Sequence, residues 1–494
     1  MMSESERPLP LSRNLISEIG AGIAALGLLN LAFLIYLDST GTHSNPYLGI
    51  LTWIAAPAIL IFGLAVFLFG LMRERRRRRL RAPGDVPQYP HIDLNQRSTR
   101  LILIWTALGL MVFVTLSVVG SYQVYHYTES DAFCGTACHS VMHPEYTAYQ
   151  QSPHARVGCA ACHVGPGAGS FVKAKLNGAH QVYSIITKKY PKPIPSPVES
   201  LRPAQQTCEQ CHWPEKFFGT QLKVFDHYAY DEESTPRAVR LLINTGGGSP
   251  VSGQTSGIHW HMNIANEVTY MATDKQRQVI PWVRMRNRKT GQVTEYRAEA
   301  SKLTDAQIAA APKRVMDCID CHNRPTHIYR SPDLSVDKAI RAGRIDRTLP
   351  FMKQQAVTVL AKDYPSSAEA TRAIRADLES YYRDNHAAVY AAKRNQITAA
   401  ASELQQIFKT TRFPEMNVDW RTHADNVGHM RTLGCFRCHD DEHVTRDGKR
   451  LTKQCDLCHT MLAPNGATVA FEHPIDLGDL RTVTCSDCHT GGGM

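Results

Sequence analysis

The sequence predicts three transmembrane α-helices followed by a large body that is mostly α-helical or irregular and contains a small antiparallel β insert. Two observations support this fold class. Three long apolar runs fall within the first 121 of the 494 residues, whereas the remaining chain is polar enough to bring the mean hydropathy to −0.28. All 14 cysteines lie beyond these runs and form seven pairs, six with two residues between the cysteines and one, Cys134 and Cys138, with three. The chain therefore divides into a membrane anchor and an extramembrane body.

The three apolar runs are each long enough to cross a bilayer. They are Leu15–Leu37, Tyr47–Met72 and Leu101–Gly120, and a helix of about 20 residues spans roughly 30 Å of hydrocarbon. Successive runs with so little charge are not typical of buried core helices. The first run is also longer than the apolar region of a signal peptide and lacks a small-x-small cleavage site. We expect three retained spans, at about 15–37, 47–72 and 101–120, in an anchor of residues 1–121.

Basic residues predict the orientation of this anchor. Arginines crowd residues 73–81, at the end of the second run, while the turn at 38–46 contains no Lys or Arg. Positive charge stays on the cytoplasmic side, so the N-terminus and the 73–100 loop are expected there and everything after Gly120 outside. The arginine run and the net charge of +10 are explained by this topology, and no nucleic-acid partner is expected.

The cysteines form pairs, and a histidine follows each pair at once. In a c-type haem site, two cysteines form thioethers to the porphyrin and the adjacent histidine ligates the iron, so all three must lie within one turn. Zinc sites do not require a histidine after every pair, and a disulfide framework requires none. We therefore predict seven covalently bound haem c groups, numbered 1–7 in chain order. The motifs are Cys134, Cys138 and His139; Cys159, Cys162 and His163; Cys208, Cys211 and His212; Cys318, Cys321 and His322; Cys435, Cys438 and His439; Cys455, Cys458 and His459; and Cys485, Cys488 and His489.

The spacing of these motifs divides the body. Residues 122–212 hold haems 1–3, 213–317 form the β-rich insert, 318–434 hold haem 4 and a helical hairpin, and 435–494 form a three-haem module. The hairpin is predicted from the helical composition of residues 368–382 and 387–408. The strands are predicted from β-branched and aromatic residues between turn signals; they are Arg237–Asn244, Glu267–Thr273, Val279–Arg286 and Val293–Arg297.

Each iron needs a second axial ligand if it is to be closed. Six-coordinate haems conduct electrons, whereas a reductase keeps one iron open. The body contains 13 histidines outside the motifs, enough to close every haem. The candidates for second ligands are Met142, His154, His227, His261, His327, His429, His443 and His473. His259 and His261 share one face if the chain is extended there, so that one reaches a haem while the other is structural.

The segment CHSVMHPEYTAYQQSPHARVGCAACH, placed after the third apolar run, resembles the NapC/NirT family of membrane-anchored quinol dehydrogenases over residues 101–215. The complete layout, with TCEQCHWPEKF, CHNRPTHIY and GCFRCHDDEHV, resembles the ImcH-type inner-membrane cytochromes. This resemblance implies a multi-pass protein of the bacterial inner (cytoplasmic) membrane with a periplasmic haem domain. It also implies oxidation of quinol or menaquinol and electron transfer to periplasmic c-type cytochromes in anaerobic or extracellular respiration. The family's quinol site maps to Met142 and to Lys173 or Lys175.

A physical argument favours the same enzyme class, a quinol:cytochrome c oxidoreductase. Quinol is lipid-soluble and can meet a haem only at the membrane surface, and the first motif begins within 14 residues of the third apolar run. Two alternatives remain open. One is a terminal multihaem reductase with an open haem acting on a nitrogen or sulfur oxyanion, and the other is a non-catalytic electron-transfer subunit of a larger membrane complex. Iron coordination and the response to quinol distinguish the three.

Overall fold

A computed structural model gives the structure of the chain. It describes residues 11–40, 56–80, 93–137, 139–165, 168–198, 201–217, 219–247, 257–261, 266–463 and 468–469. The predicted start of the second span lies outside these ranges, as do five predicted haem-site residues: Cys138, His473, Cys485, Cys488 and His489. The chain forms two compact units. Unit 1 comprises residues 1–134 and 158–187, and unit 2 comprises residues 135–157 and 188–494.

Unit 1 contains the three predicted membrane helices: α1 (Leu15–Thr40), α3 (Ala56–Leu80) and α4 (Arg97–Glu129). Each is long and apolar enough to cross a membrane, so this part of the predicted fold class is confirmed. The cluster Arg75–Arg79 belongs to the end of α3, where cations complement the helix dipole. The helix α4 continues past Gly120 to Glu129. Unit 1 also holds α6 (Cys159–His163) and α7 (Ala168–Ile186).

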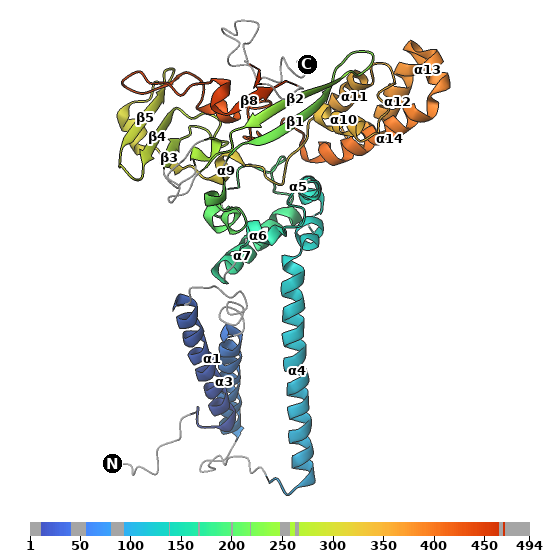
Figure 1. Ribbon diagram of the computed structural model, residues 1–494. Helices are drawn as coiled ribbons and strands as arrows, with labels where there is room; N and C mark the ends of the chain where they lie inside the picture. Colours follow the sequence, from blue (N-terminus) through green and yellow to red (C-terminus); the bar gives the residue numbers. More distant parts are fainter. Residues whose placement is uncertain are drawn as a thin grey trace. The chain divides into compact units, whose positions relative to one another are not determined.

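Helices α1 and α3 pack side by side in antiparallel directions (Figure 1). Small residues make this possible. A Cβ added to Gly20 would lie 2.3 Å from the Phe67 nitrogen, and one added to Gly63 would lie 2.4 Å from the Ala24 nitrogen. In a membrane, helices associate by close packing of this kind because lipid chains are as apolar as the side chains.

Unit 2 contains two antiparallel sheets (Figure 1). One has the order β1-β2-β8-β9 and the other the order β6-β3-β4-β5-β7. The predicted strands correspond to β2–β5, so the antiparallel β insert is confirmed. The insert forms two sheets and not one, and strands from the C-terminal part of the chain join both, β8 pairing with β2 and β7 with β5. The strands are β1 (Gln221–Tyr228), β2 (Pro236–Ile243), β3 (Asn266–Met271), β4 (Trp282–Asn287), β5 (Val293–Ala298), β6 (Arg314–Val315), β7 (His443–Val444), β8 (His459–Leu462) and β9 (Thr468–Val469).

A helical layer supplies the largest apolar core of unit 2. Its helices are α10 (Pro332–Arg341), α11 (Met352–Ala361), α12 (Ser367–Asn385), α13 (Ala387–Ala392) and α14 (Arg394–Thr411). Leu378 and Tyr382 of α12 and Leu404 and Phe408 of α14 are fully buried in this core. The helices α12 and α14 occupy the residues of the predicted hairpin.

The remaining elements are short, and most carry or flank a haem motif. They are η3 (Phe133–Ala137), α5 (His139–Gln150), η4 (Ala204–Gln206), η5 (Cys208–Gln210), η6 (Pro214–Lys216), η7 (Ile258–His261), α8 (Asp305–Ala310), α9 (Cys318–Cys321), η8 (Pro414–Met416), η9 (Gly434–Arg437) and η10 (Cys455–Leu457). The motifs thus form single turns, as attachment of two cysteines and one histidine to the same porphyrin requires.

Candidate haem sites

The turns of motifs 3, 4 and 5 share one local geometry. The backbone N–H of the motif histidine donates to the carbonyl of the first cysteine, at 2.8 Å for both His212 and His322 and at 3.1 Å for His439. This bond closes the turn and places the cysteine pair and the histidine on one short segment. At α9, Asp317 and Asp320 add a capping box that fixes the first turn.

The cysteines of the described motifs differ in how far they are exposed. Cys211 of motif 3 is exposed. The others are half-buried; they are Cys134, Cys159, Cys162, Cys208, Cys318, Cys321, Cys435, Cys438, Cys455 and Cys458. None is enclosed in the apolar core, so the described cysteines suit attachment to a porphyrin. Attachment of haem at each of the seven motifs stays a prediction, and Cys485, Cys488 and His489 of the seventh lie outside the described residues.

In unit 2, four motif histidines whose side chains the structure describes each face a second histidine. Two imidazoles that ligate one metal from opposite sides have ring centres about 6 Å apart, because each metal–nitrogen bond is about 2 Å. The observed pairs have this spacing. They are His154–His212 at 6.1 Å, His259–His322 at 6.5 Å, His261–His439 at 5.8 Å and His429–His459 at 6.1 Å.

Hydrogen bonds orient several of these rings. The Nδ1 atom of His259 lies 2.9 Å from the Thr245 carbonyl oxygen, and that of His261 lies 2.8 Å from the carbonyl oxygen of Ile258. Metal-binding histidines usually donate one ring N–H to a carbonyl and ligate with the other nitrogen. Burial also lowers the pKa of His259, His261 and His439, which favours the neutral imidazole that a metal needs.

Two further observations fit a large flat group at these sites. The buried Nδ1 atoms of His154 and His459 have no hydrogen-bond partner in the part of the chain that the structure describes. Large apolar side chains beside the motifs are exposed, with Trp213 at 55%, Val427 at 55% and Leu457 at 46%. Buried polar atoms normally have a hydrogen-bond partner. Exposed apolar surface is normally covered by a bound ligand or another molecule. A haem provides both iron and an apolar macrocycle, so the residues present fit this cofactor.

Three other candidate ligands have different surroundings. His443 is 2% exposed; its Nδ1 lies 2.9 Å from both Asp440 oxygens and its Nε2 lies 2.7 Å from the Ile280 carbonyl. This arrangement favours an imidazolium, which has no lone pair for iron, and so argues against the predicted ligand role. His227 pairs with Asp337 at 3.3 Å. His327 Nδ1 lies 3.0 Å from the Glu145 carbonyl oxygen, as an oriented ligand would.

The first cysteines of motifs 1 and 2, Cys134 and Cys159, are neighbours in unit 1 near the end of α4. The backbone N–H of Cys159 donates to Asp131 Oδ1 at 2.8 Å. Asp131 follows α4 by two residues. The end of the third membrane helix therefore holds the start of the second motif beside Cys134. The second motif continues through Cys162 to His163 on α6.

The two candidate quinol-site lysines of α7 differ in their contacts. Lys175 donates to Glu129 Oε1 at 2.6 Å and to the Thr128 carbonyl at 3.1 Å, and its Nζ lies 4.8 Å from the centre of the Phe171 ring. Lys175 and Glu129 are also electrostatic neighbours of Cys134. Lys173 is exposed. Met142 is half-buried in α5 of unit 2, and the structure does not describe the His139 side chain.

Some residues of these sites were not predicted. His259 was expected to be structural if His261 was a ligand, on the assumption of an extended chain. Both lie on the 3₁₀ helix η7, where residues two apart point in different directions. Glu129, Asp320 and Arg437 were also missed. For Asp320 and Arg437, the one feature of the sequence that could have indicated a role is their position between the two cysteines of motif 4 and of motif 5, respectively.

Comparison with known proteins gives a consistent result. The model of the N-terminal region of the NapC/NirT cytochrome c family matches residues 96–194. The chain is 46% identical over 486 residues to the cytochrome c-type protein ImcH of Geobacter sulfurreducens. The aligned region covers 96% of this chain and 95% of the relative. No solved structure matches the chain.

Proposed function

Because the chain belongs to the NapC/NirT cytochrome c family, we propose that it is a quinol dehydrogenase of the bacterial inner membrane that passes electrons to periplasmic c-type cytochromes. The observation that carries this proposal is the Lys175–Glu129 ion pair beside Cys134, at the end of α4. A lipid-soluble quinol can approach a site there from the bilayer. The haem body and Glu129 lie on the periplasmic side in this topology, which the arginines ending α3 support.

The chemistry divides between the cofactors and the side chains. Seven bound haems would supply irons that each accept one electron, so one quinol yields one quinone, two protons and two reduced irons. The side chains must take up the protons. Glu129 is the base that we assign to this step, because its carboxylate accepts hydrogen bonds and its side chain is still 17% exposed.

Lys175 prepares this base. Its ammonium group is 2.6 Å from the carboxylate and holds it in place, where a quinol hydroxyl can donate a proton to it. The Phe171 ring beneath the ammonium gives the site an apolar wall that suits a quinol ring. Lys173 has no such geometry, so Lys175 is the better of the two predicted lysines.

The paired histidines support conduction over terminal reduction. We assign His154, His259, His261 and His429 as the second ligands of haems 3, 4, 5 and 6. Closed irons cannot bind a small oxyanion. In this assignment the four haems transmit electrons, as a quinol dehydrogenase requires.

One experiment tests the function. Purified protein in detergent is mixed anaerobically with a reduced menaquinone analogue while the haem α-band is recorded, and carbon monoxide is then added. The proposal expects rapid reduction and no carbon monoxide shift in haems 3–6. Failure of quinol to reduce the haems would reject the proposal. If the protein is then reduced with dithionite and its spectrum shifts with carbon monoxide, the result would favour the reductase. A chain that responds to neither would be an electron-transfer subunit.

A further inference from the structure

Motifs 4 and 5 are joined through one short helix. Residues Ile258–His261 form η7, a 3₁₀ helix with three residues per turn, so side chains two positions apart point about 120° from each other. The His259 ring faces His322 of motif 4, while the His261 ring faces His439 of motif 5. A single turn of chain therefore reaches both sites.

A second connection runs through the side chain of Arg437, which stands between the two cysteines of motif 5. Arg437 is 8% exposed. Its Nη2 donates at 2.9 Å to the carbonyl of Asp320, the residue between the cysteines of motif 4. Nη1 donates to the Arg277 carbonyl at 2.9 Å and Nε to the Gly434 carbonyl at 2.8 Å. The guanidinium thus bonds one motif directly to the backbone of the other.

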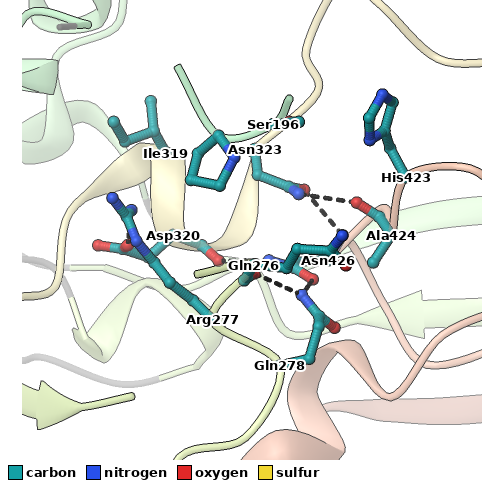
Figure 2. A pocket seen from close by; sticks show the side chains of 11 residues that line it. Ser196, Gln276, Arg277, Gln278, Ile319, Asp320, Asn323, His423, Ala424 and Asn426 are labelled. Carbon is teal, nitrogen blue, oxygen red and sulfur yellow. Dashed lines mark hydrogen bonds and ion pairs between the residues drawn. The ribbon is translucent and has the colours of Figure 1, made fainter. Parts of the chain in front are cut away.

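The carbonyl of Asp320 is part of a wider polar cluster. Figure 2 shows Asn426, whose Nδ2 donates to the same carbonyl at 3.1 Å and whose backbone N–H donates to Asn323 at 2.9 Å. Gln278 in turn donates to Asn426 at 3.1 Å. These bonds leave the Asp320 carbonyl with two donors, one from motif 5 and one from the loop that precedes it.

The Asp320 carboxylate fixes motif 4 to the second sheet. It is almost completely buried, and its Oδ1 accepts from Tyr270 of β3 and from Arg314 of β6, both at 2.7 Å. Its Oδ2 accepts from the Asp317 backbone at 2.8 Å. Motif 4 is therefore rigidly placed, and Arg437 extends that rigidity to motif 5. The thiols of Cys321 and Cys435 are also electrostatic neighbours, which places the two attachment sites close together.

We propose that haems 4 and 5 are built as one rigid pair, in which Arg437 is the positioning residue and a buried positive charge shared by both. This inference depends on the haem ligation proposed above and does not depend on quinol oxidation. Electron tunnelling weakens steeply with separation, so a fixed pair gives a fixed rate between these two sites. A buried cation also stabilises the added electron at each.

The test compares Arg437→Gln with Arg437→Lys and with the control Arg450→Gln. Arg450 is an exposed arginine paired with Glu299 at 2.9 Å, in the same C-terminal part of the chain. Haem content is measured first, followed by a dithionite redox titration and EPR of the oxidised protein. The two sites are separable by EPR because the ligand planes are 11° apart in the His259–His322 pair and 86° apart in the His261–His439 pair.

Arg437→Gln is expected to retain all haems but to make two of the one-electron reductions about tenfold less favourable, which is about 59 mV. The EPR signals of the same two haems should change. Arg437→Lys keeps the charge and restores the potentials, yet its EPR signals remain altered because a lysine cannot make all three bonds. Arg450→Gln should match the natural protein.

Unchanged potentials and signals in Arg437→Gln would overturn the proposal, as would an equal shift of every haem. If Arg437→Gln loses haem, Asn426→Ala replaces it, since this removes a bond to the same carbonyl without changing the charge. The expectation is then an altered EPR signal for the pair at unchanged potentials, and an unaltered signal would overturn the pairing. Because dithionite is the reductant, the result is independent of whether quinol reduces the protein.

Discussion

The imidazole rings of His259 and His322 lie parallel to within 11°, with 6.5 Å between their centres. This separation is close to the value of about 6 Å expected when two imidazoles ligate one iron. Because we assign His259 as the second ligand of haem 4, His259→Ala is expected to open one haem, with a high-spin signal and carbon monoxide binding equivalent to one haem per chain. Absorption spectra of the reduced protein, recorded before and after carbon monoxide, measure this.

His180→Ala is the matched control, because His180 is exposed on α7. It should bind no more carbon monoxide than the natural protein. A closed, low-spin spectrum in His259→Ala would remove His259 from the ligand assignment.

Lys175 is expected to determine the rate of quinol oxidation. Lys175→Met removes the cation that holds the base Glu129 at 2.6 Å, and loss of a positioned acid–base group typically costs about 10²-fold or more. Reduction of the haems by a menaquinol analogue should therefore slow by roughly that factor, while reduction by dithionite stays unchanged. Stopped-flow absorption at the α-band gives both rates.

Lys173→Met provides the comparison for this experiment. Lys173 lies on the same helix and is exposed, so its rate should stay within about twofold of the natural rate. Glu129→Gln should slow the reaction as Lys175→Met does, and the double variant should be no slower than the slower single variant, because residues of one unit are non-additive. Equal effects at Lys173 and Lys175 would exclude this site.

A buried ion pair stabilises the helical layer of unit 2. Lys353 Nζ lies 2.5 Å from Asp337 Oδ1 and 2.6 Å from the Asp333 carbonyl, and the Lys353 and Asp337 side chains are 2% and 6% exposed. Removing one member of a buried pair leaves an uncompensated charge, which costs about 3–5 kcal/mol. Lys353→Met should lower the free energy of unfolding by that amount, measured by denaturant titration of the helical circular dichroism.

Two further variants check the explanation. Lys362 pairs with Asp377 at 2.7 Å but is 50% exposed, so Lys362→Met should change the free energy by less than about 1 kcal/mol. In the double variant Lys353→Met and Asp337→Leu, much of the loss should be recovered because no charge is left buried. If the double variant is as unstable as the single one, packing and not charge is responsible.

His443 makes stability depend on pH. Burial is the largest single effect and alone would lower its pKa, but the hydrogen bond to Asp440, the charge of that carboxylate and the Ile280 carbonyl together outweigh burial and raise the pKa above the ordinary value of 6.5. A raised pKa means that the folded state holds the proton more tightly, so the stabilisation is complete below pH 6.5 and is lost as pH rises through the folded pKa. The free energy of unfolding should therefore fall above pH 6.5.

His443→Gln should flatten this dependence, because glutamine can bond to Asp440 but does not titrate. Unfolding measured from pH 6 to pH 9 compares the two proteins. The Asp440 carboxylate stays ionised throughout this range, since its own pKa is lowered. An identical slope in both proteins would assign the pH dependence to other groups.

The sequence predicted the parts of the fold that have a local pattern. Apolar runs located α1, α3 and α4, and β-branched segments located β2 to β5 within a few residues. The partners of these strands could not be predicted in the same way. The pairing of β2 with β8 joins Ile243 to His459, and no local periodicity encodes contact between segments so distant along the chain. Strand β1 was missed although it pairs along its whole length with β2.

The candidate sites show the same division. Motif cysteines and histidines follow from spacing alone, and His154, His261 and His429 were candidates because haem is so dense in this chain. The Asp320–Arg437 bond spans 117 residues, and both residues occupy positions that the motif leaves free. Only the folded backbone brings that carbonyl and that guanidinium together.

The pairing of β8 with β2 and of β7 with β5 has a consequence for how the protein matures. Neither sheet can be completed until the last third of the polypeptide has been made and delivered to the compartment where it folds. His459 is both the first residue of β8 and a motif histidine, so the pairing of β8 with β2 also fixes the backbone of the sixth motif.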